Sequence, residues 1–399
     1  MKGEEHGVPD RAPPQPHALL AGGGTGGHVF PALAVADELL ARGWRVSMTG
    51  ASGGLEERLA AARNLSFHGL AAKPLLGRGP LAKLAALATL ARSAGGAARL
   101  VRRLGADVVL GTGGYVSAPA VLGARLARRP ALLLEPNARA GVANRWLSRW
   151  AAAAAVGYER TAGDLRCPAV VTGVPVRQAF FAVPPLAVPA GEAGKAEVPG
   201  ALQLLVLGGS QGAQQINQAL PAAVALLLAR LPGLRIVHQA GARHEEETRR
   251  AYGAYGADRA DRNNRADQSA GLEVEVVAFL DDVASAMAAS HLLLCRAGAI
   301  TVAEICAAGR PAVLAPLAIA KGHQRDNARL LEEVGAAEVL AADELESGPG
   351  AAAALAARLA ALLGDGARLA RMGWAARQLA RPRAAAEIAD LLGRVGGAR

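Results

Sequence analysis

The feature that most constrains this fold is a pattern that recurs along the chain: an apolar segment, a glycine-rich turn, then a helical pattern. It occurs at residues 17–28, where five glycines fall within 22–27, and again at 107–115. Further copies follow at 202–213 and at 291–304, where the turn consists of small residues around the single Gly298. Strands that run through short turns into helices are typical of parallel sheets, because parallel strands need crossover connections. The sequence therefore predicts an α/β fold.

The glycine-rich turns also predict a type of ligand. Glycine leaves the backbone N–H groups open to a ligand, and the helix that follows adds a partial positive charge at its N-terminus. Phosphate groups bind at such places. The turn at 22–28 lacks the Lys-Ser/Thr ending of a P-loop and fits the dinucleotide fingerprint only loosely, so it predicts an anion site without naming the ligand.

Length and composition predict two domains. A chain of 399 residues is too long for one ordinary core, and its 52% hydrophobic content supports large buried sheets. Residues 184–200 are rich in Pro, Gly and Ala, so we expect an interdomain linker there. The expected parts are a disordered tail (1–16), a first domain (17–183), the linker, a second domain (201–380) and a last helix (381–399) that can cross back onto the first domain.

Cysteine usage and charge predict the compartment of the protein and the kind of partner that it binds. The cysteines Cys167, Cys295 and Cys306 have neither disulfide nor metal spacing, which predicts free thiols and a reducing compartment. The first residues lack the apolar centre of a secretory signal, and we expect a soluble or peripheral protein. Net charge is +10, which favours anionic partners, but 3% aromatic residues are too few for a nucleic-acid stacking surface.

Residues 73–103 form a basic stretch with an apolar face. Seven basic residues and no acidic one fall in this range, with leucines at three-residue steps from Leu81 to Leu90. Such a helix can lie on an anionic membrane surface. An ordinary amphipathic helix with a solvated basic face fits equally well.

A few polar side chains stand out at the predicted turns. His28, at the start of a helix, is a candidate acid/base group or a polar cap. Glu135 and Asn137 follow a strand, at the edge where open parallel sheets bind ligands, or they lie in a surface loop. Glu304, six residues after Gly298, would lie roughly 9 Å along its helix, a suitable distance from a diphosphate to a ribose.

Two other polar pairs stand out in the sequence. Asp281 and Asp282 are adjacent, and helix capping explains them better than a metal site. Gln324 and Asn327 lie three residues apart and share a helix face. No cluster with metal-ligand spacing is found, so we expect no metal and no cofactor.

Five motifs occur together in a characteristic order: GGGTGGH (22–28), GTGGY (111–115), GGSQGA (208–213), FLDD (279–282) and CRAGAITVAE (295–304). In these motifs the chain resembles the bacterial glycosyltransferases that make lipid II, the undecaprenyldiphospho-muramoylpentapeptide β-N-acetylglucosaminyltransferases. The resemblance runs from about residue 17 to the C-terminal helices. It leaves out the tail and the inserts at 184–200 and 252–270.

The resemblance implies a GT-B fold, in which two Rossmann-like domains face each other across a cleft. It implies inverting transfer of GlcNAc from UDP-GlcNAc to the 4-hydroxyl of the muramoyl sugar of lipid I. The expected place is the cytoplasmic face of the cell membrane, with other cell-wall synthesis proteins as partners. Metal-independent turnover is expected, because helix N-termini can neutralise the departing diphosphate.

The resemblance also implies roles for individual residues. It makes His28 and Glu135 the candidates for the general base. It assigns the acceptor to Gly23, Gly24, Thr25, Gly113, Gly114 and Tyr115. It assigns the donor to Thr25, Gly26, Gly27, Asn137, Arg177, Ser210, Gln211, Asn217, Gly298, Ile300, Thr301, Glu304, Gln324 and Asn327.

Departures from the family pattern keep alternatives open. Leu134 and Pro136 stand where the family usually has His and Gln, and Val174 stands where it has Asn. Pro136 removes a hydrogen-bond donor beside Glu135 and Asn137. The alternatives are another GT-B UDP-sugar enzyme, such as a soluble-acceptor glycosyltransferase or a UDP-GlcNAc epimerase, and a non-catalytic sugar-nucleotide-binding protein.

Overall fold

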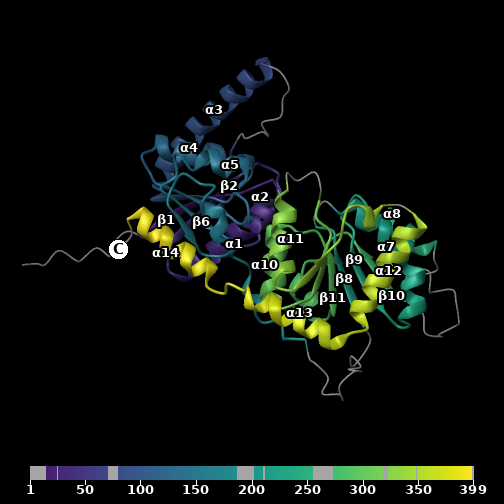
Figure 1. Cartoon of the computed structure of the whole chain (residues 1–399). Coiled ribbons are helices and arrows are strands. Elements are labelled where there is room, and N and C mark those ends of the chain that lie inside the picture. Colours follow the sequence, from purple (N-terminus) through teal and green to yellow (C-terminus); the bar gives the residue numbers. More distant parts are fainter. Residues whose placement is uncertain are drawn as a thin grey trace, which may run out of the picture.

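The computed structural model describes residues 15–24, 26–70, 80–186, 202–209, 212–254, 273–317, 322–346 and 348–397. These residues form two parallel β-sheets, each covered by helices on both faces (Figure 1). The two sheets lie side by side, with α10 (Ala299–Ala308) and α11 (His323–Glu333) at the junction between them.

The first sheet has seven strands in the described residues. In spatial order they are β3 (Ser66–Gly69), β2 (Arg45–Gly50), β1 (His17–Ala21), β4 (Val108–Gly111), β5 (Ala131–Glu135), β6 (Ala153–Val156) and β7 (Ala169–Val171). The helices of this domain are α1 (Gly26–Ala41), α2 (Leu55–Ala61), α3 (Pro80–Leu104), α4 (Gly114–Leu126), α5 (Val142–Leu147) and α6 (Glu159–Ala162).

Both faces of the middle of this sheet are buried, which explains why β1, β4, β5 and β6 are almost continuously apolar. Alternate residues of β1 enter different cores: Leu20 lies in one hydrophobic cluster and Leu19 in the cluster on the opposite face. A strand with this composition is stable only inside a layered α/β domain.

The second sheet has six described strands. In spatial order they are β10 (Glu273–Val277), β9 (Arg235–Gln239), β8 (Gln203–Leu207), β11 (Leu292–Cys295), β12 (Ala312–Leu314) and β13 (Ala337–Val339). The other described helices here are η1 (Gln178–Phe180), α7 (Gln214–Arg230), α8 (Glu245–Gly253), α9 (Val283–Ala288), η3 (Asp343–Leu345), α12 (Pro349–Leu363) and α13 (Gly366–Gln378).

The first six strands of each domain have the same order, 3-2-1-4-5-6, which is the Rossmann order. The predicted class of two Rossmann-like domains is confirmed. In each sheet the strand order reverses between the first and fourth strands, which are β1 and β4 in one and β8 and β11 in the other. The four glycine-rich turns follow these four strands, so they lie at the two places where such sheets bind ligands.

The predicted interdomain linker at 184–200 is wrong as an interdomain connection. Val176, Phe180 and Val183 already pack in a core cluster of the second sheet, and Leu186 and Leu202 pack on the other core cluster of that sheet. The first domain therefore ends near Gly173, not at 183. The described ends of the segment 187–201 both belong to the second domain.

Two arginines of the second domain fix the start of that segment. The buried Arg310 donates to the carbonyls of Met287, Ala288 and Pro184, and Arg377 donates to those of Phe181, Val183 and Ala308. Burial lowers the pKa of Arg310 to about 10, so this side chain stays charged at neutral pH. These bonds attach the chain after η1 to the second domain.

The last helix, α14 (Ala384–Gly396), lies against the first domain (Figure 1). Ile388 and Leu392 enter the core cluster that contains residues of α1, and Arg42, the residue after α1, donates to Asp390 at 2.5 Å. The chain thus crosses between the domains twice. At the first crossing Gly173 has φ +82°, and a Cβ there would lie 2.5 Å from the Cβ of Arg381 in the second crossing. The two crossings are in contact.

Several smaller expectations can be compared with the structure. Asp282 is the N-cap of α9 and accepts from the Ser285 N–H, which confirms the capping interpretation. All three cysteines are free, as predicted. The helix expected after the turn at 22–28 begins within that turn, at Gly26, and Tyr252, at the start of the insert at 252–270, is fully buried in α8.

Other expectations fall outside the described residues. These are nearly all of the tail, most of both inserts, and the residues Thr25, Lys73, Arg78, Ser210 and Gln211. Among the described helices, none is long and apolar enough to span a membrane by itself, although α12 and α13, bent by 85°, meet the length and composition criteria as a pair.

Candidate functional site

The glycine-rich turns after β1 and β4 interlock at the edge of the first sheet. A Cβ on Gly22 would lie 2.2 Å from Oγ1 of Thr112, and one on Gly114 would lie 2.5 Å from the Gly23 carbonyl oxygen. Gly113 has φ +102°, and a Cβ there would lie 2.6 Å from Nδ1 of His28. Only glycine fits these positions, so the backbones of the two turns pack closely against each other and against His28.

His28 lies between these two turns, near the start of α1. Its Nδ1 is 3.0 Å from the carbonyl oxygen of Thr112. A carbonyl can only accept, so Nδ1 carries the proton and Nε2 is left with a lone pair. Burial lowers the pKa of His28 more than the Thr112 bond and the charge of Glu135 raise it. The imidazole is therefore neutral at neutral pH, with Nε2 as the free acceptor.

Two more side chains of the first domain border the turn after β1. The ring of Tyr115 packs on Gly24, where a Cβ would lie 2.9 Å from it. Glu56, at the start of α2, is buried and accepts from the Ala51 N–H, and a Cβ on Gly23 would lie 2.3 Å from its Oε1. Glu56 was not predicted from the sequence, where Gly50 at the end of β2 and the glycines at 53 and 54 were the available signal.

Glu135 organises the loop that follows β5. It is only 1% exposed, and both carboxylate oxygens are occupied. Oε1 accepts from the backbone N–H and the side-chain amide of Asn137, and Oε2 accepts from Gly141 N and Asn144 Nδ2. Four hydrogen bonds at 2.8–3.1 Å fix the backbone at 137–144. Pro136 has no N–H to donate, and the donors of the residues that follow it take the place of the missing hydrogen bond.

This loop joins the two domains. Asn327, buried in α11, accepts from the Ala138 N–H at 2.9 Å and donates to Oδ1 of Asn137 and to the carbonyl of Ala297. Arg139 pairs with Asp326 at 3.1 Å. The carboxyl edges of the two sheets therefore meet in this structure, and Asn137 and Asn327 contact each other across the junction.

The turn after β11 forms the corresponding edge of the second sheet. Gly298 is the N-cap of α10, and Ile300 and Thr301 lie in its first turn. Glu304 lies one turn further and makes no hydrogen bond or ion pair with any described residue. Burial raises the pKa of Glu304 to about 7, against the opposing charge of Arg177.

Arg177 approaches this site from the first crossing between the domains. Its guanidinium carbon lies 5.6 Å from the ring centre of Phe30 in α1 and 5.0 Å from that of Phe180. Its Nε is buried and has no hydrogen-bond partner in the described part of the chain. A cation and a carboxylate with unused polar atoms thus lie near the same edge.

Two more predicted donor residues have partners within the protein. Gln324 accepts from the Leu317 N–H at 2.9 Å and so orders the end of the segment after β12. Asn217 donates to the Ala240 carbonyl and accepts from Nε2 of His238, inside the core. Burial lowers the pKa of His238 to about 3, so this imidazole is neutral.

The turn after β8 is described only in part, at Gly208, Gly209 and Gly212. A Cβ on Gly208 would lie 2.7 Å from the Gln239 carbonyl oxygen, and Gly209 and Gly212 both have φ +75°. This turn therefore needs glycine for the same reasons as the turns of the first domain. No group of three or more His, Cys, Asp or Glu with metal-site geometry occurs within the described ranges.

Comparison with known proteins agrees with this geometry. The sequence matches the glycosyltransferase family 28 N-terminal domain over residues 18–156 and the C-terminal domain over 203–388. A solved structure, titled as MurG of Acinetobacter baumannii, superposes with a TM-score of 0.70 at 32% identity and covers 95% of this chain and 99% of that one. A putative UDP-N-acetylglucosamine 2-epimerase from Listeria monocytogenes, at 13% identity and TM-score 0.64 over 95% of this chain and 96% of its own, shares the fold alone.

Curated relatives are similar over nearly the whole chain. The UDP-N-acetylglucosamine–N-acetylmuramyl-(pentapeptide) pyrophosphoryl-undecaprenol N-acetylglucosamine transferase of Halorhodospira halophila is 43% identical over 375 residues, covering 93% of this chain and 96% of that protein. The protein of the same name from Methylibium petroleiphilum is 40% identical over 386 residues, covering 96% and 98%.

Two Rossmann-like domains joined at their carboxyl edges, with short turns into helices at both reversal points, form the GT-B architecture, and the family matches identify the chain as a glycosyltransferase of this architecture. The chain belongs to glycosyltransferase family 28, among the N-acetylglucosaminyltransferases that these relatives represent.

Proposed function

We propose that this protein transfers GlcNAc from UDP-GlcNAc to the 4-hydroxyl of the MurNAc of undecaprenyl-diphospho-MurNAc-pentapeptide (lipid I). The products are lipid II and UDP, and the reaction belongs to peptidoglycan biosynthesis. One observation carries the proposal. A neutral imidazole lies among the glycine turns of one domain, and a carboxylate without a partner in the described chain follows the glycine turn of the other, where the two sheet edges meet.

The donor fits the second domain. The N-terminus of α10 at Gly298 offers backbone N–H groups for a diphosphate. Glu304, one turn further along the same helix, can accept two hydrogen bonds from a ribose. Those bonds would favour the charged form of Glu304 and give its buried carboxylate the hydrogen-bond partners that it lacks in the described protein.

His28 is the better placed general base. In inverting transfer, the base takes the proton of the acceptor hydroxyl while its oxygen attacks the anomeric carbon and UDP leaves. Nε2 of His28 holds a free lone pair and faces away from the Thr112 carbonyl. The two oxygens of Glu135 already accept four hydrogen bonds, so Glu135 positions the loop and, through Asn137, the contact with Asn327.

The departing diphosphate is stabilised without a metal in this proposal. The N-terminus of α10 and Arg177 supply positive charge near the place where negative charge develops. Turnover in excess EDTA should then equal turnover in magnesium.

With a lipid-linked acceptor, the proposal includes a peripheral position at the cytoplasmic face of the cell membrane, which one surface of the first domain supports. Helix α3 carries Arg92, Arg99 and Arg103 along the wall of one groove, without acidic residues in the helix. The neighbouring α5 exposes Val142 by 60% and Trp146 by 37%. Figure 1 shows α3, α4 and α5 together on one side of the first domain. Basic side chains beside exposed apolar ones favour an anionic lipid surface.

Vesicle binding tests this surface. Each Arg near an anionic surface contributes about 1 kcal/mol, so replacing Arg92, Arg99 and Arg103 by Gln should weaken binding to anionic vesicles about a hundredfold. The matched control replaces Arg230, Arg243 and Arg371, which are exposed on the second domain. Equal vesicle binding by the two triple variants would show that the basic residues of α3 do not contribute to membrane binding.

Turnover tests the whole proposal. The purified full chain is incubated with UDP-GlcNAc and a soluble lipid I analogue, and both released UDP and the disaccharide product are measured. We expect equal amounts of both products. A UDP-GlcNAc epimerase would instead change the sugar without the acceptor, and a non-catalytic binding protein would bind UDP and release nothing.

A further inference from the structure

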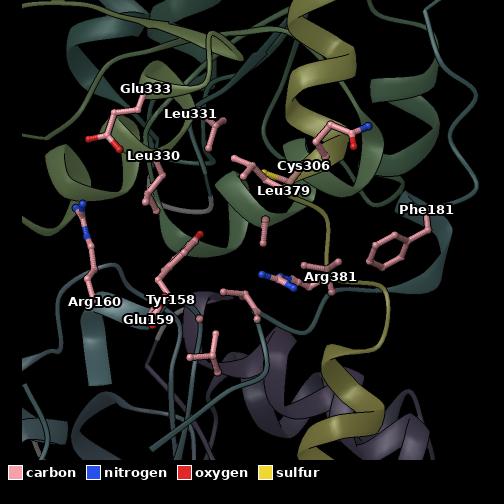
Figure 2. A pocket seen from close by; sticks show the side chains of 17 residues that line it. Tyr158, Glu159, Arg160, Phe181, Cys306, Leu330, Leu331, Glu333, Leu379 and Arg381 are labelled. Atoms are coloured by element: carbon pink, nitrogen blue, oxygen red, sulfur yellow. The ribbon is translucent and has the colours of Figure 1, made fainter. Parts of the chain in front are cut away.

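A second cavity lies between the domains, next to both crossings of the chain (Figure 2). Its volume is about 780 Å³, within the range of about 300–1,000 Å³ that small-molecule sites occupy. One wall comes from the first domain, at Tyr158 and Val174, and the other from the second, at Cys306 and Leu330. None of these residues belongs to the site described above.

The walls of this cavity are mainly apolar. Val174 lines it at the position where the family usually carries Asn, and Leu379 lines it from the second crossing. Burial raises the pKa of the Cys306 thiol to about 12, so it stays protonated and behaves as an apolar group. An apolar body of a ligand would be desolvated here.

Two polar groups in the cavity have no partner in the described structure. The Tyr158 hydroxyl makes no hydrogen bond, and burial raises its pKa, so it stays protonated and can donate. Arg381 makes no ion pair. Figure 2 shows its guanidinium pointing among the lining side chains, whereas Glu333 lies at the margin. The donor and the cation that face the centre both suit an anion.

Three other charged side chains line the cavity. Glu159 and Glu333 are exposed to solvent, as is Arg381, so water screens the two carboxylates and the guanidinium alike. Arg160 already donates to the carbonyls of Ala138 and Asp326 across the junction. Arg381 is therefore the cation that remains free to bind a ligand.

We propose that this cavity binds a small organic acid with an apolar or aromatic body and one anionic group. The body contacts Val174 and Leu379, and the anionic group lies between Arg381 and the Tyr158 hydroxyl. Because the walls come from both domains and both crossings border the cavity, the ligand binds best to one interdomain arrangement. It thereby slows any catalytic step that needs a different arrangement.

The probe for the test is 8-anilinonaphthalene-1-sulfonate, an aromatic body with one sulfonate, whose fluorescence rises on leaving water. It is titrated into the full chain in the presence of saturating UDP, which blocks the donor site. We expect binding at one site per chain that UDP does not displace. Displacement by UDP would place the probe in the donor site and overturn the proposal.

Variants locate the probe. Val171→Trp fills the cavity from an edge strand and should weaken binding by at least about tenfold. Tyr158→Phe removes only the hydroxyl and should weaken binding about two- to tenfold, and Arg381→Gln about two- to fivefold. Arg383→Gln, the same change two residues away and outside the lining, should have no effect. Unchanged binding in the first three variants would overturn the proposal.

The effect of the ligand on the interdomain arrangement is measured through kcat. This part of the inference rests on the proposed transferase activity. Saturating probe should lower kcat with little change in the KM for UDP-GlcNAc, and Val171→Trp should be insensitive to the probe. Probe binding without any change in kcat would overturn the coupling. A protein without transferase activity would refute the proposed function but leave the binding test valid.

Discussion

The two halves of the site have the same architecture, but the polar side chains of one half have hydrogen-bond partners and those of the other do not. Each half places glycine-rich turns and a helix N-terminus at the reversal point of a Rossmann-like sheet. In the first domain, His28 and Glu135 are held by hydrogen bonds within the protein. In the second, Glu304 and the Nε atom of Arg177 lack partners among the described residues. The first half is thus preorganised for chemistry, and the second is completed by its ligand.

The largest expected effect comes from removing the preorganised base. His28→Ala should lower kcat by about 10²–10⁴-fold, the usual contribution of a positioned general base. UDP affinity measured by calorimetry should stay within about twofold, because His28 belongs to the other half. If kcat persists and only the acceptor KM rises, His28 is a binding contact and Glu135 becomes the favoured base.

Removing Glu304, the carboxylate without a partner in the described residues, should weaken donor binding instead. Glu304→Ala loses two charge-assisted hydrogen bonds to the ribose, of about 1.5–3 kcal/mol each, partly offset by the relief of burying a charge. We expect UDP binding to weaken by at least about tenfold in calorimetry. Glu332→Ala, an exposed residue of α11, is the matched control. Unchanged UDP affinity in Glu304→Ala would remove Glu304 from the donor site.

Glu135→Gln tests whether the first half depends on its internal bonds. The amide group would face N–H donors that now bind a carboxylate oxygen, and each donor left unsatisfied costs about 1–3 kcal/mol. We expect a lower free energy of unfolding in urea and a reduced kcat, with the pH dependence of kcat unchanged. A shifted pH profile at full stability would instead make Glu135 the titrating base.

The pH dependence of stability should be the smallest effect. Because the pKa of Glu304 is raised to about 7 in the folded protein, its contribution to stability is complete below the usual carboxyl pKa. That contribution is lost as pH rises through about 7. Ligand-free wild type should therefore lose Tm between pH 5 and 8 relative to Glu304→Gln. Parallel Tm curves for the two proteins would contradict the raised pKa.

The sequence predicted the features that local chemistry determines. Glycine turns between apolar strands and helices are local signals, so the turns at Gly22, Gly111, Gly208 and Gly298 all lie where expected. Strands β6 and β13 were missed because they are short and rich in alanine, a residue that favours helices, and neighbouring strands hold them in the sheets.

Long-range contacts explain the other misses. The domain boundary was placed too late because Phe180 and Val183 are buried by residues more than a hundred positions away. The partner of Asn137 is Asn327, in the other domain, and no spacing rule relates the two. Glu56 lacks any motif of its own, and only the fold brings its carboxylate beside Gly23.

The attachment of the chain after η1 to Arg310 and Arg377 has a practical consequence. Because Pro184 and Leu202 both belong to the second domain, the chain between them leaves and re-enters the same domain. Doubling the length of a connection that closes on one domain costs only about 0.6 kcal/mol of closure entropy. A peptide tag or a fluorophore inserted there would therefore report on the second domain without altering its hinge to the first.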